Sequence, residues 1–250
     1  PGSSGLRYYL NDCLVQNTYR TSDRRSSSLF TYMLSGLARV YTPEIREVLC
    51  VGMGIGIVPM DFARAGARVD VVEINAAILP VAEQYFDLDP TKLRITVGDG
   101  RHYLAVTTNR YDTIILDAFL GESVPSHLMS REALTVMKQR LRPDGTLVMN
   151  TFGDTTLGRD YFLVSLYRTL RVVFREVRVH AMGNGNVFFL AGDREGLSAL
   201  RPPDLSVVPG GLVGQVRGTY DTLMNLEGRK GDVLTDDFNP GGVADVNDHH

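Results

Sequence analysis

The stretch Glu47-Val-Leu-Cys-Val-Gly-Met-Gly-Ile-Gly56 decides the fold of this chain. Its first half is a mostly apolar run that predicts a β-strand over 47–51, and its second half is a glycine-rich turn. The residues that follow predict a helix over 57–65, with Pro59 tolerated in the first turn and Gly66 as the stop signal. A strand, a glycine-rich turn and a helix in this order are typical of an α/β sheet.

The alternation of strands and helices continues on both sides of this stretch. Before it, the pattern predicts a short strand or hairpin over 6–17, a polar loop over 21–28 and a helix over 29–40. After it, we expect strands at 69–73, 93–97, 111–116 and 146–151, and helices at 76–85, 101–106, 131–141 and 160–174. A turn at Pro143-Asp-Gly145 is expected to end the helix over 131–141. The last two strands, 176–181 and 186–191, flank a Gly-Asn-Gly turn that favours an antiparallel hairpin.

The composition is that of an ordinary soluble globular chain, with 250 residues of which 44% are hydrophobic and 22% charged. A net charge of −3 predicts no nucleic-acid partner. Cys13 and Cys50 have neither the spacing of metal ligands nor that of a disulfide framework, so we expect no metal. No apolar stretch approaches the roughly 20 residues that cross a bilayer. Because the chain starts at Pro1, we expect it to be processed or cut from a longer protein.

Three acidic residues each stand where a predicted strand ends: Glu73, Asp99 and Asp117. In an open parallel sheet the ligand lies outside the carboxyl ends of the strands. One nucleoside-shaped ligand that touches the glycine-rich turn and these acids would explain the whole set. The sequence therefore predicts a nucleoside site.

The glycine spacing indicates which nucleoside to expect. Gly52, Gly54 and Gly56 give G-x-G-x-G, and Ile57 stands where the dinucleotide fingerprint G-x-G-x-x-G needs its last glycine. Glu73 follows Gly52 by 21 positions, where a carboxylate can accept hydrogen bonds from two ribose hydroxyls. A nucleoside that carries a sulfonium therefore fits better than one that carries phosphates.

Each of these residues also has a purely structural interpretation. Gly54 could serve only a tight strand-to-helix turn, and Glu73 could complement a helix dipole. Asp99 could cap the helix that follows it, and Asp117 could cap backbone N–H groups at the start of a loop. Their order and spacing together favour the nucleoside site.

The chain resembles the spermidine synthase family, the polyamine aminopropyltransferases. LNDCLVQNTYRTS is similar to a family strand that ends in D-G-x-x-Q, with Asp12 and Gln16 in place and Cys13 where the family has glycine. SSSLFTYML, VLCVGMGIG, VVEIN, GDGRHYL and YDTIILDAF then follow in family order. LTDDFNP resembles a tail of spermidine-synthase-like domains, many of which are fused to membrane segments.

The resemblance implies a Rossmann-like class I S-adenosylmethionine-dependent transferase fold. We expect an N-terminal β segment and loop at 1–28, a nucleoside-binding catalytic domain at 29–194 and a C-terminal extension at 195–250 that wraps the domain edge. It also implies a small-molecule amine acceptor and a homo-oligomer. The expected location is the cytoplasm, or a soluble domain of a membrane-anchored parent protein.

By position, the resemblance makes Asp117 the catalytic aspartate. An amine with a pKa near 10 is protonated at neutral pH, so a carboxylate is needed to orient it and accept its proton. The nucleoside of decarboxylated S-adenosylmethionine, or of S-adenosylmethionine itself, would be held by Gln16, Gly52, Gly54, Gly56, Glu73, Asp99 and Gly100.

The chain also departs from the family pattern. Ile55 replaces the acid that meets the cationic end of the decarboxylated donor, and the second acid after Asp117 is missing. Phe30 occupies the position of a family tyrosine, with Tyr32 two residues further on. Replacement contacts to the amine are expected from Tyr32, Glu122, Asp236 and Asp237.

Three functions follow from these features. The first is aminopropyl transfer from decarboxylated S-adenosylmethionine by SN2 displacement, which Gln16 and LTDDFNP favour. The second is methyl transfer from S-adenosylmethionine, which Ile55 favours because it removes a repulsion against the methionine carboxylate. The third is a non-catalytic nucleoside-binding module, which would need Glu73 and Asp99 but not Asp117.

Overall fold

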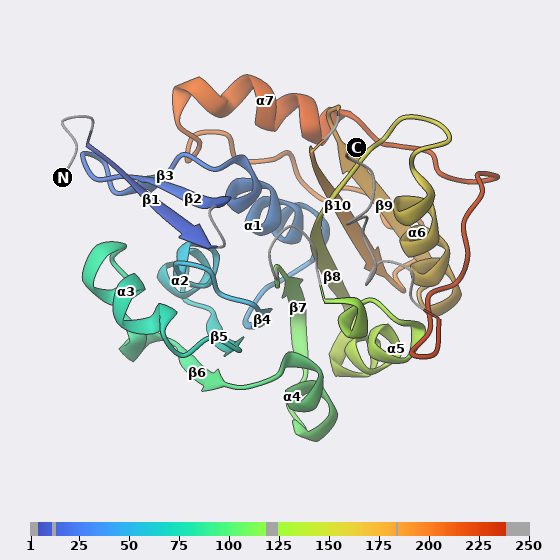
Figure 1. The fold of residues 1–250 in the computed structure, drawn as a ribbon, viewed down its shortest axis with the longest axis horizontal. Coiled ribbons are helices and arrows are strands. Elements are labelled where there is room, and N and C mark those ends of the chain that lie inside the picture. The colour runs from blue at the N-terminus through green and yellow to red at the C-terminus, as the bar shows by residue number, and fades with distance from the viewer. Residues whose placement is uncertain (1–4, 12–13, 119–124, 184, 239–250) are drawn as a thin grey trace, which may run out of the picture.

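The computed structural model describes residues 5–11, 14–118, 125–183 and 185–238, which are built around one large sheet (Figure 1). Seven strands form this sheet in the order β6-β5-β4-β7-β8-β10-β9. They are β4 (Glu47–Val51), β5 (Arg68–Glu73), β6 (Arg94–Val97), β7 (Tyr111–Leu116), β8 (Leu141–Gly153), β9 (Glu176–Ala181) and β10 (Gly185–Gly192). The strands from β6 to β8 pair in parallel, whereas β10 is antiparallel to β8 and β9. The predicted α/β class and the C-terminal antiparallel hairpin are confirmed.

Helices cover both faces of the sheet (Figure 1). One face carries α1 (Leu29–Tyr41), α2 (Ile57–Arg64), α3 (Ile78–Tyr85) and α7 (Gly210–Asp221), and the other carries α4 (Gly100–Val106), α5 (Arg131–Arg140) and α6 (Tyr161–Val173). Alternate residues of the central strand enter the two cores: Val48 and Cys50 pack on the first face, Leu49 and Val51 on the second. Burial on both faces explains why these strands are almost continuously apolar.

The N-terminal residues form a separate antiparallel sheet of three strands: β1 (Leu6–Asn11), β2 (Leu14–Arg20) and β3 (Arg25–Ser26). Of the short strand or hairpin predicted over 6–17, the structure shows the antiparallel hairpin, and it extends to Arg20. Arg24 pairs with Asp87, and Arg7 donates to the carbonyl of Tyr85, so the hairpin is fixed to the end of α3. This attachment holds β2 against the carboxyl ends of the large sheet.

Two expectations about the chain after residue 130 were wrong. Helix α5 agrees with its predicted range to within one residue, but the Pro143–Gly145 turn that was expected to end it lies within β8, at an irregularity in the pairing with β7, and β8 begins at Leu141 rather than at Thr146. Helix α7 was not expected at all, because its sequence GGLVGQVRGTYD contains four glycines, which weaken isolated helices. Contacts with α1 and β9 stabilise α7, and its Tyr220 hydroxyl occupies the space beside Gly36. No helix in the described ranges is long and apolar enough to cross a membrane.

A buried carboxylate ties together the beginnings of three strands. Asp70 of β5 is 3% exposed and accepts hydrogen bonds from Arg94 of β6, from Tyr111 of β7 at 2.6 Å and from Asn109 at 3.1 Å. Burial acts to raise the pKa of Asp70, but the hydrogen bonds from Tyr111, Arg94 and Asn109 outweigh it and the pKa is lowered. The same three strands carry Glu73, Asp99 and Asp117 at or just after their other ends.

We expect Asp70→Asn to lower the free energy of unfolding by about 2–4 kcal/mol near neutral pH, because it removes one partner of a buried ionic hydrogen-bond cluster. The folded pKa lies below the unfolded value of about 4, so this stabilisation is present above that pH and is lost as the pH falls through the folded pKa. Urea unfolding at neutral and acidic pH measures both effects.

The matched control for this experiment is Asp23→Asn. Asp23 pairs with Arg20 at the surface, with side chains 41% and 36% exposed, so its loss should cost less than about 1 kcal/mol. Equal costs for the two substitutions would contradict the role of the Asp70 cluster.

Candidate active site

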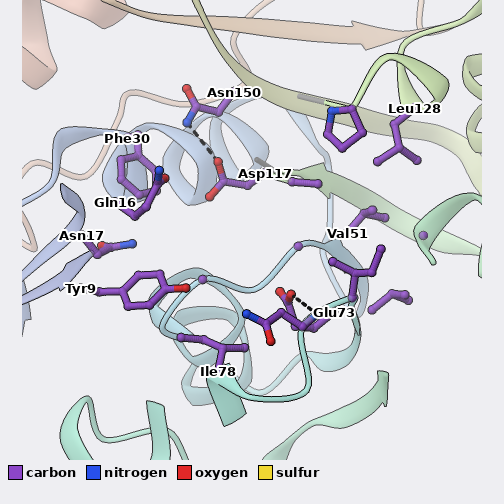
Figure 2. Close-up of a pocket in the computed structure, with 18 of the residues that line it drawn as sticks. Tyr9, Gln16, Asn17, Phe30, Val51, Glu73, Ile78, Asp117, Leu128 and Asn150 are labelled. Carbon is purple, nitrogen blue, oxygen red and sulfur yellow. Dashed lines mark hydrogen bonds between the residues drawn. The ribbon is translucent and has the colours of Figure 1, made fainter. Parts of the chain in front are cut away.

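A cavity of about 1120 Å³ opens at the carboxyl ends of the parallel strands, beside the N-terminal hairpin (Figure 2). This is the place where an open α/β sheet binds its ligand. Of the residues predicted for the site, the cavity lining brings together Gln16, Gly52, Gly54, Glu73, Asp99, Gly100 and Asp117. The volume is large enough for a small molecule and a co-substrate.

The glycine-rich turn after β4 brings the backbone close to the cavity. A Cβ on Gly52, whose φ is +87°, would lie 2.4 Å from the carbonyl oxygen of Asp117. A Cβ on Gly54, whose φ is +53°, would have only the amide of Asn17 within 4 Å, at 3.5 Å, so this glycine faces open space. Gly56 does not line the cavity; it begins α2 and packs against Leu88.

Glu73 lies at the end of β5 and is held by backbone N–H groups. Oε2 accepts a hydrogen bond of 2.9 Å from the N–H of Met53, and Oε1 accepts one of 2.9 Å from the N–H of Asn75. The carboxylate is therefore fixed against the glycine-rich turn while its remaining lone pairs stay available for a ligand. Figure 2 shows Glu73 and Asp117 at opposite sides of the cavity.

Asp99 both lines the cavity and caps a helix. Its Oδ1 accepts a hydrogen bond of 2.8 Å from the N–H of His102 at the start of α4, and its Oδ2 lies 3.1 Å from Nε2 of His127. Burial acts to raise the pKa of Asp99, but these two partners outweigh it and the pKa is lowered. The capping role considered from the sequence is therefore present alongside the position in the cavity.

Asp117 follows β7 and is half-buried. Its backbone N–H donates to the carbonyl of Val51 at 3.0 Å, and its Oδ1 accepts a hydrogen bond of 3.0 Å from Nδ2 of Asn150. Burial raises the pKa of Asp117 to about 6, against a smaller lowering by Asn150. A carboxylate with this pKa is mostly ionised at neutral pH and is a stronger base than an ordinary aspartate.

Three of the four predicted amine contacts, Tyr32, Asp236 and Asp237, do not line the cavity. Phe30 lines the cavity, but Tyr32, about 200° further around α1, donates to the carbonyl of Ser26 at 2.8 Å. Asp236 forms an ion pair with Arg101, and neither it nor Asp237 lines the cavity. Glu122 lies outside the described residues.

Several lining residues were missed from the sequence. Asn150 stands in the mostly buried strand run LVMNTF, where a polar residue near a carboxyl end was an available signal. Asn186 and His127 gave no such signal, because one begins a hairpin strand and the other lies in a short turn. Asn17 directly follows Gln16, and its Oδ1 is buried without a hydrogen-bond partner among the described residues.

These features suit a nucleoside at the Glu73 side of the cavity. The open face of Gly54 leaves room for close approach, Glu73 offers fixed acceptors, and the buried amide of Asn17 lacks a partner that a ligand could supply. Within the described ranges, no group of three or more His, Cys, Asp or Glu side chains is arranged to hold a metal ion.

Comparisons with known proteins agree with this geometry. A family model for the spermine/spermidine synthase domain matches residues 28–182. The polyamine aminopropyltransferase of Vibrio vulnificus is 31% identical over 236 residues, which cover 86% of this chain and 75% of that protein.

Two solved structures show the same fold. A probable spermidine synthase from Corynebacterium glutamicum has a TM-score of 0.66 at 17% identity and covers 91% of this chain and 92% of its own. Human methyltransferase-like protein 13, solved in complex with SAH, has a TM-score of 0.58 at 22% identity, and the match covers 79% of this chain and 95% of its own. The family match contains every element from α1 to β9, and therefore all the strands that carry the cavity's three acids. The chain belongs to the spermine/spermidine synthase family of transferases and has the Rossmann-like class I fold that the sequence predicts.

Proposed function

We propose that this chain transfers an aminopropyl group from decarboxylated S-adenosylmethionine to an amine acceptor. The observation that carries the proposal is the charge of the cavity. Glu73, Asp99 and Asp117 line it, and no lysine or arginine does so among the described residues. A sulfonium donor and an amine acceptor are both cations, and this lining suits both of them.

Asp117 is the proposed catalytic residue. The acceptor amine is protonated at neutral pH and must lose a proton before its lone pair can attack carbon. The Asp117 carboxylate orients the amine and accepts that proton while the new N–C bond forms. The C–S bond breaks with its electron pair going to sulfur, and methylthioadenosine leaves without needing an acid because the sulfonium is already a good leaving group.

The nucleoside is proposed to lie at the opposite side of the cavity. Glu73 would accept hydrogen bonds from the ribose, and Asp99 would meet the adenine amino group. Gln16, Gly52, Gly54 and Gly100 would complete the lining, and Gly56 would act indirectly by starting α2. Aromatic side chains of Phe30 and Phe152 line the same cavity and suit a cationic acceptor.

Methyl transfer from intact S-adenosylmethionine is the second candidate. Ile55 is 1% exposed and packs in the core, so this position offers no acid to repel a methionine carboxylate. The absence of lysine and arginine from the described lining weighs against it, because a carboxylate would find no cation there.

Mass spectrometry of reactions with a panel of amines and either donor tests the proposal directly. We expect methylthioadenosine, together with an amine heavier by one aminopropyl unit, from the decarboxylated donor. S-adenosylhomocysteine from the intact donor would instead support methyl transfer. Intact nucleoside binding with neither product would argue for the non-catalytic module.

Asp117→Asn should reduce turnover by a factor of about 10² or more while nucleoside affinity stays within a few-fold, because the amide cannot accept a proton. In the unsubstituted protein, kcat/KM should fall as the pH drops through about 6, where Asp117 becomes protonated. Unchanged turnover in the variant would remove Asp117 from the mechanism.

The same substitution should stabilise the fold. The folded pKa of Asp117 is raised, so the ionised form opposes folding once the pH exceeds the unfolded pKa of about 4. The amide should raise the free energy of unfolding by about 1–3 kcal/mol near pH 8, and the gain should vanish below about pH 4. Retained stability also shows that lost turnover does not come from unfolding.

Glu73→Ala should weaken nucleoside binding by about 1.5–3 kcal/mol, the usual loss for hydrogen bonds to a charged group. Part of this loss would come from the freed N–H groups of Met53 and Asn75. Calorimetry measures the affinity, with Glu83→Ala on the exposed side of α3 as the matched control. Equal affinity in both variants would remove Glu73 from the binding site.

A further inference from the structure

Two asparagines connect the candidate catalytic carboxylate, which follows β7, to β10, two strands further along the sheet. Nδ2 of Asn186 donates a hydrogen bond of 2.9 Å to Oδ1 of Asn150, and Nδ2 of Asn150 donates one of 3.0 Å to Oδ1 of Asp117. All three side chains line the cavity, and Figure 2 shows the Asn150–Asp117 bond. The three residues form a continuous chain from β10 through β8 to the end of β7.

The register of the sheet creates this chain. In the antiparallel pairing of β10 with β8, Phe188 lies opposite Asn150, so Asn186 is the diagonal neighbour of Asn150 on the same face. In the parallel pairing of β7 with β8, Leu116 lies opposite Met149, which places Asp117 beside Asn150.

The direction of the hydrogen bonds follows from the chemistry of the groups. An ionised carboxylate only accepts hydrogen bonds, so the NH₂ end of Asn150 must face Asp117. If the Asn150 amide turned by 180°, its oxygen would face the carboxylate and its NH₂ would face the NH₂ of Asn186. With Asn186 oriented as in the structure, its donor therefore disfavours the wrong orientation of Asn150.

Few other polar groups act on Asp117. The remaining ionisable residues in the described lining are Tyr9, Glu73, Asp99 and His127. The neighbouring strand β4 also carries an ionisable residue, Cys50, which is buried and does not line the cavity. None of the lining residues is a lysine or arginine that could hold the carboxylate in its ionised form. The amide of Asn150 is thus the side-chain group that opposes the effect of burial on the pKa of Asp117.

The second carboxylate oxygen of Asp117, Oδ2, is the one left for a ligand. Oδ1 is occupied by Asn150, whereas Oδ2 has no hydrogen-bond partner in the part of the chain that the structure describes. We propose that Asn186 and Asn150 are a positioning pair that keeps Asp117 ionised and directs its Oδ2 toward the acceptor amine. The catalytic part of this inference rests on the proposed aminopropyl transfer, but the effect on the Asp117 carboxyl does not.

The test uses Asn186→Leu, which removes the donor without touching Asp117. The carboxyl of Asp117 is titrated by carbon NMR in protein with ¹³C-labelled aspartate, and its signal is assigned by its loss in Asp117→Asn. We expect the pKa of Asp117 to rise by about half a unit to one unit, since Asn150 loses the partner that orients it. The acid limb of kcat/KM should move to higher pH by the same amount, with unchanged affinity for methylthioadenosine.

Asn17→Leu is the matched control, because it removes an amide from the same cavity that does not bond to Asp117. It should leave the pKa of Asp117 unchanged. Asn186 is partly exposed, and Asn186→Ala provides a second variant should the leucine disturb folding. An unchanged pKa in a folded Asn186 variant would overturn the positioning pair and leave the proposed function standing. A shifted pKa in a protein without aminopropyl transfer would confirm the effect on the carboxyl and refute only the proposed function.

Discussion

The contact between Gly52 and the backbone of Asp117 is the constraint on which the site depends. Because Gly52 has no side chain, the chain after β7 can pass within a distance that a Cβ would block. The N–H of Gly52 donates to the carbonyl of Val72, and the N–H of Asp117 donates to the carbonyl of Val51. The central strand is thus bonded on both sides at the level where the site begins, and Glu73 and Asp117 project from fixed backbone positions.

The two sides of the cavity hold their carboxylates by different means. Backbone N–H groups fix Glu73 and Asp99, so these acids are as rigid as the turns that carry them. A side-chain amide holds Asp117, and there burial outweighs the hydrogen bond, so its pKa moves in the opposite direction from that of Asp99. Under the proposed function, these different surroundings would suit the carboxylates on one side to binding and the carboxylate on the other to proton transfer.

Most of the fold could be predicted because its strands, helices and turns depend on local sequence patterns. Apolar runs predicted β4 and β7, and the Gly-Asn-Gly turn helped to predict β9, all with their observed bounds; strand ends marked Glu73 and Asp117. The pairing of Asn150 with Asn186 could not be predicted, since it depends on the register between β8 and β10, and a slip of one residue would turn either side chain to the opposite face. Asp236 was misplaced for a similar reason: the path of the tail, and so its encounter with Arg101, is set by long-range packing.

The segment after α7, residues 222–224, covers part of the edge strand β9 and so affects how the molecule meets other molecules in a crowded solution. The N–H of Ala181 donates to the carbonyl of Thr222, the N–H of Met224 donates to the carbonyl of Val179, and Leu223 bridges to His180. These bonds occupy outward-facing backbone groups of β9, which would otherwise be an open edge of the sheet. Exposed edges recruit strands from other molecules, so this short stretch of chain protects the protein against edge-to-edge aggregation at that side.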